Sequence, residues 1–305
     1  MAKRFESVLG KFIWNNSGWF LRVAIDEVKN IPEKGGLGLV CVSSMCNSLL
    51  ASQFLRLLKS SDEKSVAHIA YWIGDSLHEF LPGIDVGTHP INIPDYYAYI
   101  ESLIVLGRID DLITPQSWRI LTNKMLYKEK TLSFSVPKVE SDAGFSYSRV
   151  WRRLNLPIIS SKDRDIAYLL VHNKLPTQER LFRVGMVNDP YCTVCLGAVV
   201  SDVEHVFSGC VKVHGCWTLI QNEILSLIGV HTPVVDILNF FFPSSVYDNE
   251  VVWLICSYVT KVWQEIYVRG RTNMKSEELF GFLKFKYKVD QQGKRQVMRQ
   301  IPGLL

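Results

Sequence analysis

The feature that most constrains the fold of this chain is a set of three cysteines and one histidine. They follow one another as Cys-x2-Cys-x9-His-x4-Cys, at Cys192, Cys195, His205 and Cys210. Thiolates and imidazole nitrogens are the ligands of structural Zn²⁺, and a Cys-x2-Cys pair delivers two sulfurs from one tight turn. Four protein ligands leave no position for water or substrate, so such a metal stabilises a fold and does not catalyse. The pattern predicts a structural zinc site.

Alternatives remain open at this site. His214 and Cys216 lie close enough in sequence to replace His205 or Cys210 as ligands. Cysteine is also often buried as a small apolar side chain, so a metal-free core is the competing interpretation. A RING domain is disfavoured because it needs a second set of four ligands. The other three cysteines have no partner at ligand spacing and are expected to be core thiols: Cys41, Cys46 and Cys256.

The composition indicates a globular protein. The chain has 305 residues, of which 48% are hydrophobic and 21% charged, and at ~150 residues per domain it has room for about two domains. It shows no secretory signal pattern and no apolar run near the ~18 residues of a membrane span. Its odd number of cysteines, seven, fits reduced thiols better than disulfides. We expect an intracellular protein of the nucleus or cytoplasm, without a membrane partner.

The basic residues are unevenly distributed. The formal net charge is only +4, yet residues 261–305 carry ten Lys or Arg against four acids, and residues 149–190 carry eight against four. Neutralising phosphates releases counterions, so basic stretches beside a zinc module suggest RNA or DNA as the partner. The alternative is that these residues form an ordinary solvated helix surface.

Apolar periodicity predicts a mainly α-helical fold. Ser161 is expected to cap a helix, and the glycines at 35–38 to form a tight turn, because the G-x-G-x-x-G order of a dinucleotide loop is absent. Prolines and glycines indicate a linker over 82–98. Any strands are expected to be short, around Cys192–Leu196 and 131–136. The expected helices cover residues 5–30, 41–60, 95–107, 115–128, 146–154, 161–173, 177–184, 216–228 and 249–268.

Two groups of residues resemble the reverse transcriptases of LINE-type (non-LTR) retrotransposons. The first, Phe12-Ile13-Trp14 with the segment from Pro32 to Leu39, is similar to the region just after the polymerase core. The second is similar to the zinc-binding region at the C-terminal end of these enzymes. It comprises the four candidate ligands together with Trp151, Arg164-Asp165, the run from His172 to Thr177, Arg180-Leu181, Glu204, Val206-Phe207 and Trp217. The resemblance covers about residues 5–60 and 115–220, and is weaker from 220 to 270.

The resemblance implies four segments in a mainly α chain. These are a thumb-like helical segment over 1–81, a connecting region over 82–145, a reverse-transcriptase zinc-binding domain with a small zinc-knuckle insert over 146–228, and C-terminal helices with a basic tail over 229–305. The family's aromatic-Ala-Asp-Asp polymerase motif, expected before Gly35, is missing. Asp110-Asp111 follows Gly35 instead and is interpreted as a helix boundary.

We therefore expect a nucleic-acid-binding C-terminal fragment of such a reverse transcriptase, without its own polymerase site and without a small-molecule substrate. RNA, DNA and the rest of a reverse transcriptase are its expected partners. The alternative function is a zinc-stabilised helical domain for protein interaction or structure.

Several side chains have expected roles in this function. Arg180 and Arg183 are expected to face outward, with Leu181 and Phe182 packed inward, and His172 is expected to be a packed hydrogen-bonding residue. Phe207 is expected to pack over the zinc turn in preference to stacking on a base. The residues expected to contact nucleic acid are Arg149, Arg152, Arg153, Lys174, Arg180, Arg183 and Tyr191.

Overall fold

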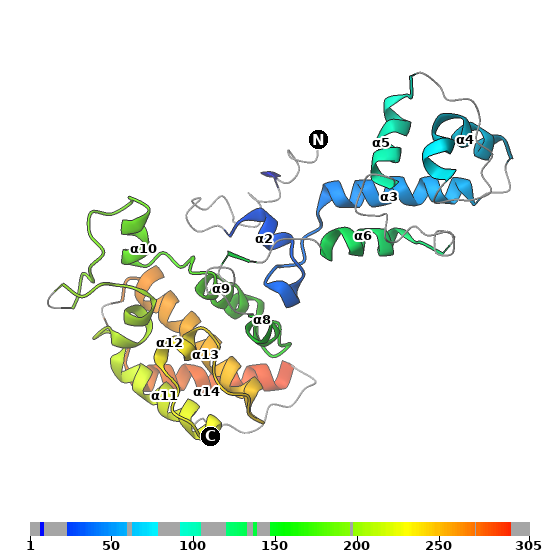
Figure 1. Cartoon of the computed structure of the whole chain (residues 1–305). Coiled ribbons are helices and arrows are strands. Elements are labelled where there is room, and N and C mark those ends of the chain that lie inside the picture. The colour runs from blue at the N-terminus through cyan, green and yellow to red at the C-terminus, as the bar shows by residue number, and fades with distance from the viewer. Residues whose placement is uncertain are drawn as a thin grey trace. The chain divides into compact units, whose positions relative to one another are not determined.

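A computed structural model describes residues 7–8, 23–59, 63–78, 92–104, 120–132, 137–138, 147–195, 198–271 and 273–293. The chain divides into two compact units (Figure 1). The first contains residues 1–12, 29–31 and 37–135, and the second contains residues 13–28, 32–36 and 136–305. Both are built from helices, which confirms the predicted mainly α fold. Among the described helices, none has both the length and the apolar character needed to cross a bilayer.

The first unit is organised around α3 (Val42–Leu58). Helices α4 (Glu63–His78), α5 (Asp95–Ile104) and α6 (Asn123–Leu132) pack against it. Phe54 and Leu55 of α3, Ile100 of α5 and Leu126 of α6 are almost completely buried, and they form the apolar centre of this unit.

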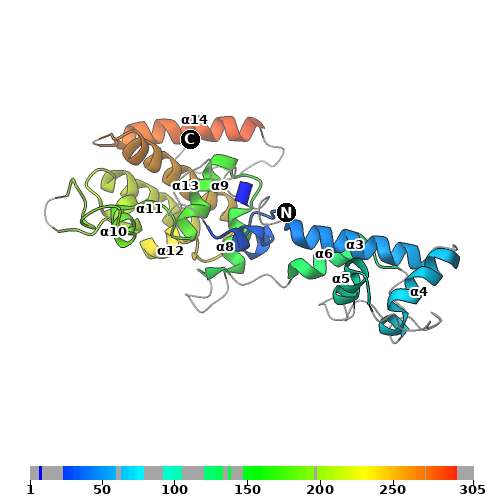
Figure 2. The ribbon, with the colours of Figure 1, turned by 90° about the horizontal axis from the view of Figure 1, so that it is seen from above.

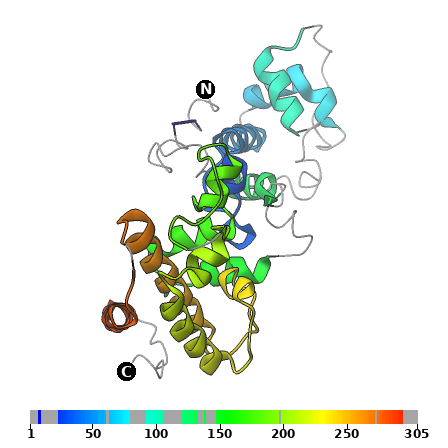
Figure 3. The same ribbon diagram turned by 90° about the vertical axis from the view of Figure 1, so that its left-hand side faces the viewer.

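The second unit is organised around α13 (Asp248–Val262), in which nearly every residue is buried. It packs against α8 (Ser148–Leu154), α9 (Ser161–Val171), α11 (His214–Ile228) and α14 (Ser276–Gly293) (Figures 2 and 3). Short helices α10 (Gln178–Arg183) and α12 (Val234–Leu238) and two π-helical segments, η3 (His205–Gly209) and η4 (Trp263–Val268), complete it. One hydrophobic core runs from Tyr147 to Tyr287, so the segments 146–228 and 229–305 fold around the same interior.

Most of the predicted helices are present with shifted ends. Residues 115–119 of the helix expected over 115–128 lie outside the described residues. Residues 120–122 are not helical and α6 begins at Asn123, where the Thr122 hydroxyl accepts a hydrogen bond from the Met125 amide and so caps the first turn. It continues through Leu132, so the strand expected from 131 is wrong at its first two residues. The cap expected at Ser161 is one residue earlier: the Ser160 Oγ accepts from the Asp163 amide at 3.2 Å.

Other expectations fall partly outside the described residues. The helix over 5–30 is described at residues 7–8 and in α2 (Ile25–Lys29). The linker over 82–98 is described only from residue 92, and α5 already begins at Asp95. Residues 133–136 and Asp110-Asp111 lie outside the described residues. Helices α4 and α14 lie within the segments expected to be helical, 1–81 and 229–305, although their individual bounds were not predicted.

The segment 31–39 forms the expected tight turn. After the 3₁₀ turn η2 (Pro32–Lys34), Gly35 adopts φ +76°, a conformation that favours glycine. Its carbonyl accepts a hydrogen bond from the Tyr168 hydroxyl at 3.1 Å and lies 3.2 Å from His172 Nε2. The His172 ring stacks on Trp151, and burial lowers the pKa of His172 to about 4. His172 is therefore a neutral, packed residue near neutral pH.

Gly35→Ala should strongly destabilise the second unit. A Cβ at this position would lie 2.6 Å from two ring atoms of the buried Trp151. We expect the free energy of unfolding to fall by about 2–5 kcal/mol, from the left-handed backbone and the overpacking together. Urea denaturation of the full chain measures this. Gly229→Ala is the matched control, because Gly229 has φ +74° with open space around it. Equal losses in both variants would show that Trp151 moves aside at no cost.

Candidate metal centre

The structure brings the four predicted ligands together. Cys192 and Cys195 come from the turn that follows Pro190, and His205 and Cys210 come from the two ends of η3. Cys195 Sγ lies 3.5 Å from His205 Nε2 and 3.8 Å from Cys210 Sγ, and Cys192 Sγ lies 4.0 Å from Cys210 Sγ. All four ligand atoms lie within 4.8 Å of one another.

These separations fit a tetrahedral zinc ion. With Zn–S bonds of ~2.3 Å and Zn–N bonds of ~2.0–2.1 Å, the edges of a tetrahedron are ~3.8 Å between sulfurs and ~3.6 Å between sulfur and nitrogen. The distances of 3.8, 4.0 and 3.5 Å agree with those edges. Three sulfurs and one imidazole nitrogen form a closed structural donor set, which would hold the metal without catalysing a reaction.

The π-helical turn explains how His205 and Cys210 meet. In an α-helix, residues five apart point ~140° away from each other. In η3 the Cys210 amide donates to the His205 carbonyl at 2.8 Å, which closes a wider turn and returns the chain to the same side. The hydroxyl of the buried Tyr258 in α13 donates to the Phe207 carbonyl inside this turn. Phe207 is fully buried, as expected for a residue that packs and does not stack on a base.

Backbone hydrogen bonds hold the cysteine turn. The Cys192 amide donates to the Val199 carbonyl at 2.8 Å, and Tyr191 and Val200 form a single antiparallel β-bridge. The strand expected at Cys192–Leu196 is wrong over the described residues 192–195, because a Cys-x2-Cys ligand pair needs a turn. On the other side of the site, Asp202 Oδ1 accepts from the His205 amide at 2.8 Å. This contact fixes the backbone from which the histidine ligand projects.

The electrostatics of the site suit a divalent cation. Burial tends to raise the pKa of Cys192, but hydrogen bonds from the Cys195 and Val194 amides outweigh it and lower that pKa to about 6. Burial raises the pKa of Cys210 to about 12, and the negative charge of Cys192 adds to this. Metal binding requires deprotonated thiols, and a cation relieves the repulsion between neighbouring thiolates.

The alternative ligands have other partners. His214 Nδ1 lies 3.2 Å from the Ser208 carbonyl, and Cys216 Sγ donates to the Met274 carbonyl. Neither belongs to the four-residue cluster. Of the three expected core thiols, Cys41 and Cys256 are buried, whereas Cys46 is exposed on α3 and that prediction is wrong.

The candidate nucleic-acid residues on α8 separate into two kinds. Arg149 and Arg152 are exposed. Arg153 is only 3% exposed, and its guanidinium donates to the Phe240 and Phe242 carbonyls and pairs with Asp248 at 3.0 Å. Because these internal partners occupy its donors, Arg153 stabilises the core, and we remove it from the candidate binding surface.

The candidates around α10 form a cluster of positive charge. Lys174 and Arg180 are half-buried; burial lowers the pKa of both, and repulsion from a neighbouring guanidinium adds to the effect. Arg180 donates to the Asn173 carbonyl, and the exposed Arg183 pairs with Glu179. Tyr191 is 42% exposed. Next to Arg183, Phe182 is exposed on α10, so its predicted inward packing is wrong.

Part of the C-terminal basic charge is neutralised inside the fold, which the charge count did not reveal. The side chain of Glu265 in η4 is only 2% exposed and pairs with Lys261, Arg269 and Arg271 at 2.7–2.8 Å. Lys261 and Arg269 lie four residues to either side of Glu265 in the sequence, a spacing that signals such pairs. These three cations are therefore poorer candidates for phosphate contacts than Arg149 and Arg152.

Comparison with protein families relates part of the chain to a known family. The family model described as zinc-binding in reverse transcriptase matches residues 145–217. No curated protein and no solved structure matches the chain. The matched range begins just before α8 and ends within α11, and it contains all four residues of the Cys3His cluster. Residues 145–217 are thus a zinc-binding region related to that of reverse transcriptases.

Proposed function

We propose that this protein is a nucleic-acid-binding part of a reverse transcriptase of the LINE (non-LTR) type. In this proposal the zinc ion fixes the Cys turn and η3, and arginines around them bind the phosphates of RNA or DNA. Residues 1–81 would correspond to the thumb-like segment. The carboxylates for polymerisation would come from the rest of such an enzyme, so these residues bind nucleic acid and do not catalyse phosphoryl transfer.

The observation that carries the proposal is the grouping of cations within the matched range. Arg149 and Arg152 are exposed three residues apart on α8, and therefore lie near one another on its surface. Lys174 and Arg180 approach each other although their charges repel. A folded protein gains little by gathering like charges, whereas a polyanion neutralises them and releases its counterions.

Replacing Arg149 and Arg152 together by alanine should weaken nucleic-acid binding and its dependence on salt. For single strands, the slope of log affinity against log salt is about −0.7 per phosphate neutralised, so losing two contacts makes the slope shallower by about 1.4. At low salt we expect a loss of affinity on the order of tenfold. Fluorescence anisotropy with single-stranded RNA and DNA oligonucleotides across a salt series measures both quantities.

The matched control is the double variant Arg149→Lys and Arg152→Lys. It keeps both charges, so it should retain the salt slope of the original chain. If the alanine variant keeps the original salt slope, Arg149 and Arg152 do not contact phosphates, and the contacts must lie elsewhere in the chain. If the original chain shows no salt-sensitive binding at all while it holds zinc, the alternative function, a zinc-stabilised domain for protein interaction or structure, is favoured.

A further inference from the structure

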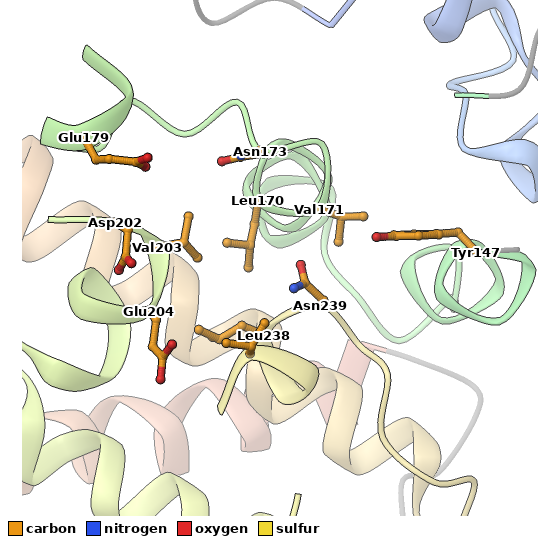
Figure 4. A pocket seen from close by; sticks show the side chains of 11 residues that line it. Tyr147, Leu170, Val171, Asn173, Glu179, Asp202, Val203, Glu204, Leu238 and Asn239 are labelled. Carbon is orange, nitrogen blue, oxygen red and sulfur yellow. The ribbon is translucent and has the colours of Figure 1, made fainter. Parts of the chain in front are cut away.

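A pocket of about 390 Å³ lies beside the metal-binding segment (Figure 4). Its walls come from the end of α9, from α10, from the residues that lead into η3, and from α12. The volume lies within the range of small ligand sites, ~300–1,000 Å³. The pocket is therefore large enough for one extended side chain.

The chemistry of the pocket differs from end to end. Glu179, Asp202 and Glu204 lie at the side nearest η3, whereas Tyr147 lies at the opposite side (Figure 4). Apolar side chains of α9 and α12, among them Leu170, line the space between. No lysine, arginine or histidine is among the lining residues of the described chain. The pocket thus combines an apolar middle with an acidic end.

The acidic end carries charge that the fold only partly balances. Arg183 pairs with Glu179. Asp202 uses Oδ1 to accept the His205 amide, a hydrogen bond that leaves its negative charge in place. Glu204 is exposed directly before the histidine ligand. Asp202 and Glu204 therefore present about two negative charges, on a backbone that the metal centre holds in position.

We propose that this pocket binds an arginine or lysine side chain of a protein partner. The apolar stem of such a side chain lies along Leu170 and its neighbours, and the cationic head reaches Asp202 and Glu204. Amides at the pocket, Asn173 and Asn239, carry a donor and an acceptor each, which suits the peptide groups beside the inserted residue. A nucleic-acid strand does not fit here, because its phosphates would meet the carboxylates.

The test is an NMR titration of the 305-residue, zinc-loaded chain, labelled with ¹⁵N, in the absence of nucleic acid. The probe is a blocked Gly-Ser-Arg-Ser-Gly peptide, and its twin carries neutral citrulline in place of arginine. We expect saturable shifts of the amides of Glu179, Asp202, Glu204 and Asn239. Binding of the citrulline twin should be at least tenfold weaker, because the cation is missing.

Variants at Glu204 localise the binding. Glu204→Gln should weaken the arginine peptide about threefold, and Glu204→Lys should weaken it at least tenfold, with the zinc content unchanged. Glu277→Gln is the matched control, since Glu277 is exposed on α14 outside the pocket, and it should bind like the original chain.

Four outcomes would overturn the proposal: no saturable shift, equal binding of the citrulline twin, shifts confined to other residues, or an unchanged affinity in both Glu204 variants. Two further probes test other occupants. Tighter binding of spermidine than of the peptide would assign the pocket to a small polyamine, and competition by single-stranded oligouridylate would assign it to RNA. The peptide titration itself contains no nucleic acid, so its result is independent of the proposed phosphate contacts on α8; oligouridylate is added only in the separate competition experiment.

Discussion

Purified chain is expected to hold about one zinc ion, and Cys210→Ser is expected to lose it together with the fold around η3. The serine hydroxyl is a poor zinc ligand, so the variant should not retain the ion. The other three ligand side chains would then lie close together without a cation to hold them. Structural zinc contributes about 10–16 kcal/mol of apparent binding free energy in small finger peptides. Here the hydrophobic core of the second unit persists, so we expect a fall in Tm of roughly 10 °C without complete unfolding. Elemental analysis and thermal denaturation measure the two effects.

Two controls separate the metal centre from other cysteine and histidine positions. Cys46→Ser changes an exposed thiol on α3, and His214→Ala changes the histidine that contacts the Ser208 carbonyl. Both should retain zinc, and Cys46→Ser should also retain the original Tm. Zinc kept by Cys210→Ser, or lost from His214→Ala, would show that the ligand set is not the one the structure brings together.

Arg153→Ala should destabilise the second unit by about 2–4 kcal/mol, because it removes a buried guanidinium and leaves its acceptors without a donor. The variant leaves the Asp248 carboxylate without its 3.0 Å partner and the carbonyls of Phe240 and Phe242 without their guanidinium donor. The guanidinium also lies 3.7 Å from the centre of the Phe242 ring, so packing is lost as well. Urea denaturation followed by circular dichroism measures the loss.

The neighbouring residue is the control for this prediction. Arg152 is exposed one position earlier on the same helix, so Arg152→Ala should change the free energy of unfolding by no more than about 0.5 kcal/mol. Arg153→Ala should thus lower the free energy of unfolding much more than Arg152→Ala does. Arg152→Ala should instead lower the affinity for nucleic acid. Similar unfolding free energies for the two alanine variants would contradict the assignment of Arg153 to the core.

The predictability of this protein differs between elements. Helices α3, α9, α11 and α13 follow from their apolar periodicity, because each buries one stripe or nearly its whole surface. The start of α6 did not follow, since a single hydroxyl at Thr122 sets it. The π-helical form of η3 did not follow either: it depends on how His205 and Cys210 converge and on the hydrogen bond from Tyr258, fifty-one residues away.

The mainly α class, the four candidate metal ligands and the relation of residues 145–217 to reverse-transcriptase zinc-binding regions could all be predicted from the sequence, because ligand spacing and apolar periodicity are local properties of the chain. Which basic side chains stay accessible to a partner depends on how the helices pack. Arg149, Arg152 and Arg153 look alike in sequence, yet the third enters the core and pairs with Asp248 from ninety-five residues away. Charge burial depends on contacts between distant segments, and no count along the chain contains that information.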